Sequence, residues 1–205
     1  MTVDIRVVRA GQTYCCYLRE TVVGDGRRLA RTLLREAQEE AGVPVGRWMG
    51  RGLAVLGLTA GQEATEAQLR KLCGERGRHP DADVIEAERL AKGESAKKAF
   101  KAGVLGRQVM VTGVDLIFRP QPTTYLLWAL GDEESRRVIE AAHERVIERV
   151  LEWIEDEVAV SRYGKDGIYR VRPPGGLVAA RFRHYEARSG RPLLHDHYSD
   201  TRERR

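Results

Sequence analysis

The pattern of apolar and polar positions predicts strands near both ends of the chain and one in its middle, with helices between them. Residues 3–8 alternate between the two kinds, and Val3, Ile5 and Val7 fall on one face, as in a strand. The other strand candidates are apolar or alternating runs bounded by glycine, proline or polar clusters; they cover residues 14–23, 109–118, 168–171, 176–185 and 193–198. We expect the last of these to be short, because a polar tail follows Tyr198.

A helical repeat of apolar residues is clearest in residues 133–158. The stripe indicates an amphipathic helix packed on a sheet; its members are Val138, Ile139, Ala142, Val146, Ile147, Val150, Leu151 and Ile154. Another helix is predicted to begin at Thr65, because Thr65 and Gln68 have the spacing of a capping box. Shorter helical stretches cover residues 27–41, 81–91 and 95–102, and Gly42 is a plausible residue to end the first.

The order of these elements indicates the fold class. Strands and helices segregate without a regular β-α-β alternation, so we expect an α+β fold with helices packed on an antiparallel β-sheet. A chain of 205 residues is long enough for one sizeable core, which favours a single domain over residues 1–205.

The composition excludes some classes of protein. A hydrophobic fraction of 42% with 32% charged residues is typical of a soluble globular chain. No apolar run approaches the roughly 20 residues of a membrane span, and the alternating N-terminus does not resemble a signal peptide. Of the three cysteines, Cys15 and Cys16 are adjacent, a spacing that rarely forms a disulfide. A reduced, cytoplasmic location is therefore expected.

The charge is unevenly distributed. Residues 161–205 carry 11 Lys and Arg against 5 Asp and Glu, whereas residues 132–158 carry 4 against 10. A basic end beside an acidic helix suits a protein that offers one face to a polyanion. Charges scattered over a solvated surface would give the same counts, so composition alone leaves both interpretations open.

Three of the five histidines fall in the last 22 residues, at His184, His195 and His197. His195 and His197 are two residues apart, so on a strand they point to the same face. A hairpin through residues 187–192 would return them beside His184. Three imidazoles leave coordination positions open on a divalent ion, which is the arrangement of a catalytic metal site. His143 lies on the long predicted helix near its apolar stripe, and we interpret it as structural.

The histidine segments also carry a resemblance to a known family. Phe182-Arg183-His184, followed by Leu194-His195-Asp196-His197, is similar to the three-histidine signature of MobF-type (TrwC-like) conjugative relaxases, which belong to the HUH endonucleases. The similarity extends in order over nearly the whole chain; it includes residues 6–26, 42–57, 58–68, 113–118, 127–130, 140–143 and 176–180.

The resemblance implies an HUH-endonuclease relaxase-like fold and a metal-dependent DNA nicking reaction. A tyrosine near the N-terminus would attack a phosphodiester of single-stranded DNA at a plasmid transfer origin, leaving the DNA 5′-end attached to the protein. The nucleophile would be Tyr14 or Tyr17, and Asp115 would be the acidic residue that assists it or orients a metal ligand. Other proteins of the transfer apparatus would be further partners.

The resemblance also implies the residues that bind metal and DNA. His184, His195 and His197 would hold a divalent metal ion, which would be Mg, Mn or Zn and would activate the scissile phosphate. Arg183 and Arg188 would bind the DNA backbone.

The chain departs from the family pattern at several positions. Asp196 stands where the family usually has threonine between two histidines, and Gln121-Pro122-Thr123 replaces a Pro-Lys-Ser run. Ala37 and Gln38 stand where related enzymes commonly have a second tyrosine pair. A polar tail follows Tyr198, and no Walker motif occurs. We therefore expect a relaxase domain that is incomplete at its C-terminus and has no helicase domain.

Two alternatives to an active nicking domain stay open. One is a catalytically inactive, truncated relaxase fragment that retains at most DNA or protein binding. The other is an unrelated metal hydrolase that uses the same three histidines on a small substrate.

Overall fold

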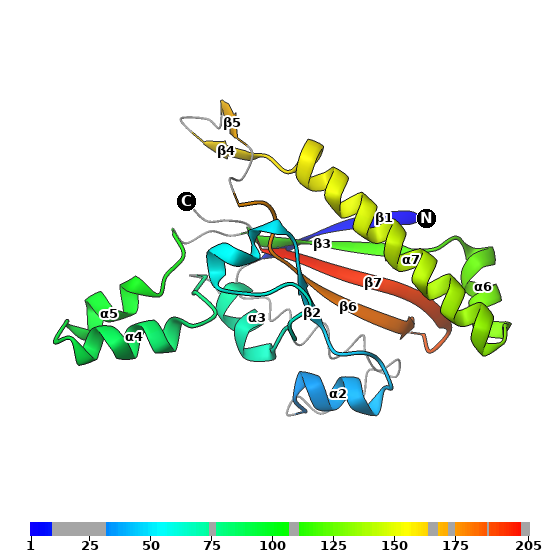
Figure 1. Ribbon diagram of the computed structural model, residues 1–205, viewed down its shortest axis with the longest axis horizontal. Coiled ribbons are helices and arrows are strands. Elements are labelled where there is room, and N and C mark those ends of the chain that lie inside the picture. Colours follow the sequence, from blue (N-terminus) through cyan, green and yellow to red (C-terminus); the bar gives the residue numbers. More distant parts are fainter. Residues whose placement is uncertain are drawn as a thin grey trace.

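The centre of the protein is a five-stranded antiparallel sheet (Figure 1). The computed structural model describes residues 1–9, 32–73, 77–106, 111–163, 168–171, 175–187 and 189–201. The strand order is β1-β3-β7-β6-β2. Their bounds are β1 (Thr2–Arg9), β2 (Arg47–Met49), β3 (Val111–Arg119), β6 (Ala179–Glu186) and β7 (Pro192–Thr201). Helices pack on this sheet, so the predicted α+β class is confirmed.

Strand β7 is longer than its sequence pattern predicts. It was expected to end near Tyr198, yet it pairs with β3 as far as Thr201 and with β6 as far as Asp200. Tyr198 is fully buried and packs edge-on against Phe118, with ring centroids 5.2 Å apart. Backbone pairing with a strand on each side is independent of side-chain polarity, which explains why the polar tail concealed the end of a central strand.

One face of the sheet is covered by α7 (Glu133–Trp153), which continues as the π-helical turn η2 (Ile154–Val158). The side chain of Asp132 caps the helix by accepting the backbone N–H of Ser135 at 2.8 Å. The C-terminal half of the predicted apolar stripe packs on the sheet: Ile147 joins a core of Leu116, Phe118, Ala179 and Tyr198, and Val150, Leu151 and Ile154 pack against it. The stripe was wrong for Val138, Ala142 and Val146, which are exposed. The preceding helix α6 (Pro122–Leu130) was not predicted; it begins with Pro122 in its first turn, a position that tolerates proline.

The other face carries α2 (Leu34–Glu40), the 3₁₀ turn η1 (Arg51–Leu56) and α3 (Glu66–Cys73). The predicted capping box is present, since Thr65 Oγ1 accepts the Gln68 N–H at 3.3 Å and Gln68 Oε1 accepts the Thr65 N–H at 3.2 Å. The core on this side includes Val8, Trp48, Leu53, Leu69, Leu72 and Phe182. Gly42 follows α2 with a φ of 63°, which agrees with its predicted place at the helix end.

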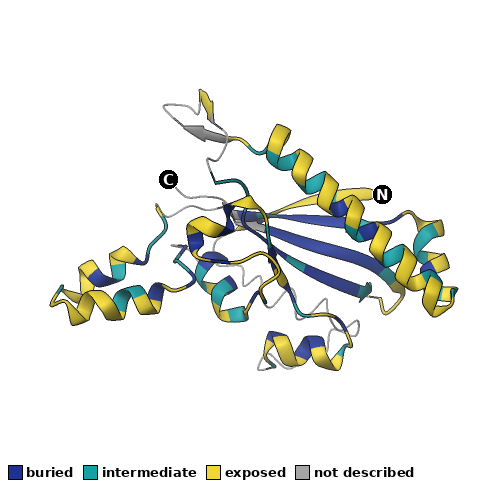
Figure 2. Ribbon diagram, in the orientation of Figure 1, coloured by how far each residue is buried: buried dark blue, intermediate teal, exposed yellow. Residues whose placement is uncertain are grey.

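The remaining elements project from the sheet. Helices α4 (Ala82–Ala91) and α5 (Ala96–Ala102) pack on each other as a hairpin whose residues are mostly exposed (Figure 2). Strands β4 (Ser161–Tyr163) and β5 (Tyr169–Val171) form a separate two-stranded sheet. Among the described residues, every helix is too short or too polar to cross a lipid bilayer.

Strand β1 lies at one edge of the sheet and exposes the face that its apolar residues occupy. Val3, Ile5 and Val7 share a face as predicted, but they are exposed at 39%, 70% and 53%. Val8, on the other face, is buried in the same core cluster as Phe182. The two-residue period thus predicted the strand correctly but did not show which face the core covers.

Candidate metal centre

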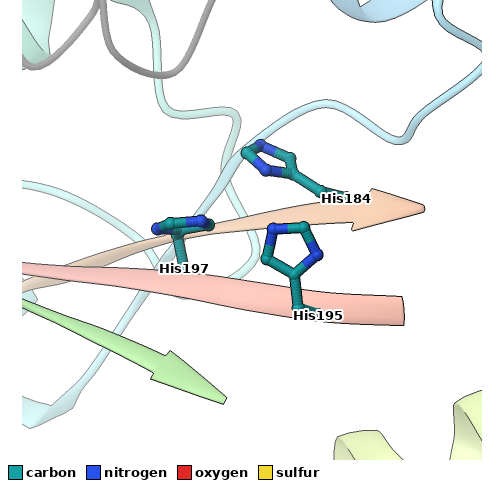
Figure 3. A group of neighbouring side chains, drawn as sticks. All are labelled: His184, His195 and His197. Carbon is teal, nitrogen blue, oxygen red and sulfur yellow. The ribbon is translucent and has the colours of Figure 1, made fainter. Parts of the chain in front are cut away.

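Three histidines from two neighbouring strands converge on one point (Figure 3). His184 of β6 stands directly opposite His195 of β7 in the antiparallel ladder, and His197 lies two residues further along β7 on the same face. The three ring centroids are 4.9 to 5.1 Å apart. The hairpin that joins the two strands therefore brings together the histidines singled out from the sequence.

The cluster has the donors and the spacing that a metal ion requires. Each histidine offers one ring nitrogen, and these three nitrogens all lie within 4.8 Å of one another. All three side chains are buried, and neither ring nitrogen of His184 has a hydrogen-bond partner within the described part of the chain. A buried polar group without a partner is costly. A metal ion bound by the three imidazoles would supply that partner, so the residues fit a metal centre.

Two of the imidazoles are held by a second contact. His195 Nδ1 lies 2.9 Å from the backbone oxygen of Leu193, and His197 Nδ1 lies 2.9 Å from Asp115 Oδ2. A carbonyl oxygen can only accept a hydrogen bond, and the same holds for the oxygen of an ionised carboxylate. In both contacts, therefore, Nδ1 carries the proton and donates it. That tautomer leaves Nε2 as the nitrogen that could bind a metal ion, and a carboxylate behind a ligating histidine is a common partner in metal sites.

Burial keeps two of the rings neutral at neutral pH. It lowers the pKa of His184 well below the usual value, and the neighbouring His197 and His195 lower it further. Burial, together with His197, lowers the pKa of His195 to about 4. A metal ion binds the neutral imidazole, so these ligands are already in the form that coordination needs.

A buried charge cluster lies behind the histidines, on the α7 face of the sheet. Asp196 sits between the two β7 histidines in sequence but points to this opposite face, where its side chain is completely buried. Asp196 Oδ1 accepts from Arg181 Nε at 3.0 Å and from Arg183 Nε at 3.3 Å. On α7, His143 Nε2 lies 2.9 Å from Asp196 Oδ2.

These three partners outweigh the effect of burial on the pKa of Asp196. Burial raises the pKa of its carboxyl, but His143, Arg183 and Arg181 together bring that pKa well below its usual range. Sequence reasoning identified His143 as structural but did not find this cluster. The position of Asp196 in the sequence could have indicated it, because a residue between two histidines that share one face of a strand must point to the other face.

The other residues singled out from the sequence divide into two groups. Asp115 is 2% exposed and contacts His197, so the structure brings it to the cluster. Arg183 lies on the opposite face from the three histidines, is 9% exposed, and also contacts Glu140 at 3.4 Å. Tyr14, Tyr17 and Arg188 lie outside the described residues.

Comparison with known proteins places the chain among relaxases. The family model of the TrwC relaxase matches residues 16–199, which include the three histidines and Asp115. None of the curated proteins compared is similar to the chain.

Several solved structures share the fold. A copper-bound complex of the conjugative relaxase TrwC with oriT DNA has a TM-score of 0.56 at 22% identity, over 98% of this chain and 57% of the other. A metal-bound complex of the same relaxase has a TM-score of 0.55 at 22% identity, over 98% and 56%. A complex with a 27-mer DNA comprising the recognition hairpin and the cleavage site has a TM-score of 0.53 at 22% identity, over 98% and 55%.

The present chain therefore spans little more than half the length of these solved relaxases. The match of the family model, over residues 16–199, covers most of the 205 residues of the present sequence. On that evidence, the chain belongs to the TrwC relaxase family.

Proposed function

We propose that this chain is the metal-dependent nicking domain of a conjugative relaxase, which cleaves single-stranded DNA at a transfer origin and rejoins it. The observation that carries the proposal is the buried cluster of three histidines, whose ligand nitrogens lie within 4.8 Å of one another. Family membership supports the same reaction class, and the solved relatives named above are complexes with oriT DNA. Such a reaction would take place in the cytoplasm, with other transfer proteins as further partners.

His184, His195 and His197 would hold the divalent ion in this proposal. Imidazole donors suit several divalent ions, so Mg, Mn and Zn are all candidates to test. When bound, the ion supplies positive charge that polarises the scissile phosphate. The chain's own contribution is a rigid set of ring-nitrogen donors: Asp115 orients His197, and the Leu193 carbonyl orients His195.

The nucleophile in this proposal is Tyr14 or Tyr17. The tyrosine oxygen forms a bond to phosphorus while the bond from phosphorus to the DNA 3′-oxygen breaks, and that oxygen leaves as a hydroxyl after it receives a proton. The phosphotyrosine retains the energy of the phosphodiester, so the reverse attack by a 3′-hydroxyl can rejoin the strand without ATP. Arg188 is a proposed contact to the DNA backbone, whereas Arg183 would act through Asp196.

The metal site is tested by thermal unfolding with and without Mn²⁺, Mg²⁺ or Zn²⁺. Metal at 100 times its dissociation constant should stabilise the native protein by about 2.7 kcal/mol. We expect this rise to disappear in the double variant His195→Ala/His197→Ala. The matched control is His79→Ala, whose side chain accepts the backbone N–H of Asp81 at 3.1 Å and lies outside the cluster. An unchanged metal response in the double variant would contradict the site.

The reaction is tested by incubating the protein with labelled single-stranded transfer-origin DNA and detecting a covalent adduct that survives denaturation. We expect Tyr14→Phe or Tyr17→Phe, or the pair together, to abolish the adduct. A metal response without any adduct would instead indicate an inactive member that only binds. Hydrolysis of a small phosphoester that persists in the double tyrosine variant would indicate the unrelated hydrolase.

A further inference from the structure

Arg119 stands at the end of β3 on the same face of the sheet as the three histidines. Side chains alternate along a strand, so Arg119 shares a face with Asp115, four residues earlier. Asp115 contacts His197 and thereby marks that face as the one that carries the histidines. Arg119 is therefore placed at the rim of the metal centre.

The strand register brings Arg119 close to His195. Phe118 pairs with Asp196, so one step further along each antiparallel strand lie Arg119 and His195. A guanidinium thus lies beside one edge of the histidine cluster.

The guanidinium of Arg119 is held only weakly by Asp4. It forms an ion pair with Asp4 of β1, and the two side chains are 36% and 45% exposed. Ion pairs exposed to this degree contribute little free energy, so an incoming anion can replace the carboxylate at small cost. Arg119 Nε is buried and has no hydrogen-bond partner among the described residues, which leaves a donor unsatisfied next to the site.

We propose that Arg119 forms a phosphate subsite next to the metal centre, where its guanidinium binds the non-bridging oxygens of a phosphodiester in single-stranded DNA. The planar fork of N–H donors in arginine matches two oxygens of one phosphate. The proposal rests on the proposed function for the identity of the polyanion. Asp4 holds the guanidinium in place when no DNA is bound and competes with phosphate for it.

This assignment differs from the one that the sequence suggested. Arg183 had been the candidate DNA-binding residue on the described strands, but it faces α7 and is engaged by Asp196 and Glu140. Arg119 lies on the histidine face and is partly exposed. The two arginines can therefore be separated experimentally by their effects on DNA binding.

The test measures binding of a fluorescein-labelled oligothymidylate by anisotropy, in Mn²⁺ and at several salt concentrations. Arg119→Gln should weaken binding about tenfold and make the slope of log affinity against log salt shallower by about 0.7, the value for one phosphate contact on a single strand. Arg119→Lys keeps the charge and should restore the salt slope, with part of the affinity. Asp4→Asn removes the competing carboxylate and should tighten binding.

Matched controls separate this role from a general effect of charge. Arg137 is 75% exposed on α7, away from the histidine face, so Arg137→Gln removes the same charge elsewhere. Asp83 is 69% exposed on the α4 hairpin, so Asp83→Asn is the control for Asp4→Asn. We expect both controls to bind like the unchanged protein. Thermal stabilisation by Mn²⁺ should persist in Arg119→Gln, which shows that its fold and metal centre are intact.

The outcomes for the subsite and for the nicking reaction are distinct. The subsite is overturned if Arg119→Gln binds DNA with the affinity and salt slope of Arg137→Gln, or if the unchanged protein binds no oligonucleotide. The nicking proposal fails separately, if the unchanged protein forms no covalent adduct. Arg119-dependent binding without an adduct would support the subsite and contradict the nicking reaction.

Discussion

Replacing Asp196 by alanine would test whether the buried charge cluster holds the strands that carry the histidines. The Asp196 side chain is completely buried, and its carboxylate contacts Arg181, Arg183 and His143 at the same time. Its loss leaves two arginines, with side chains only 11% and 9% exposed, without their shared carboxylate. Removing one partner of a buried ion pair costs roughly 3–5 kcal/mol, because the remaining charges stay buried with only part of their compensation. Here Arg181 keeps Glu144 and Arg183 keeps Glu140.

That loss would be a large part of the stability of a domain, which is typically about 5–15 kcal/mol. The assay is urea unfolding followed by tryptophan fluorescence, with the metal removed by a chelator. With a urea dependence of about 2 kcal/mol per M, the midpoint should fall by about 2 M. Asp196→Asn should lose less, because the amide oxygen still accepts one hydrogen bond although the charge is gone.

The matched control is Asp83→Ala. Asp83 also pairs with a cation, Lys71, at 2.7 Å, but its side chain is 69% exposed. An exposed pair of this kind contributes less than about 1 kcal/mol. If Asp196→Ala lowers the free energy of unfolding no more than Asp83→Ala does, the argument from buried charge is refuted.

Two further predictions concern the histidine face. In the metal-free protein, burial lowers the pKa values of His184 and His195 below those of the unfolded chain, so protons bind the unfolded state first as the pH falls. The free energy of unfolding should therefore be highest above about pH 7 and should decline between about pH 6.5 and 4. His195 alone should account for about 3 kcal/mol of that decline. A free energy of unfolding that stays constant over this range would contradict the pKa shift. Asp115→Asn should weaken Mn²⁺ binding about 10- to 100-fold in calorimetry, because the carboxylate that orients His197 loses its charge; an affinity equal to that of Asp83→Asn would show that Asp115 has no such role.

The local features of the chain were readable from its sequence. The spacing of His195 and His197 puts them on one face of any strand, because side chains alternate with a period of two. The helix within residues 133–158 and the capping box at Thr65 are set by contacts within one or two turns, and the structure confirms both. The hairpin after β6 is also local, so the meeting of His184 with His195 was predictable.

The contacts that complete the site required the tertiary structure. Asp115 and His197 are 82 residues apart, and nothing in either strand pattern states that β3 lies beside β7. The same pairing places Arg119 next to His195. Strand order is determined by long-range packing of whole elements, so it cannot be derived from the periodicity of any one of them.

Burial likewise depended on the complete fold. The sequence shows that Asp196 and its two histidine neighbours point to opposite faces, and that residues 3–8 alternate in the same way. Only the packing of α7 on β7 makes Asp196 a buried anion, and the edge position of β1 leaves Ile5 exposed. The sequence by itself determined which side chains share a face, whereas the tertiary structure decided which faces are covered, because burial is a property of neighbours that the local chain does not contain.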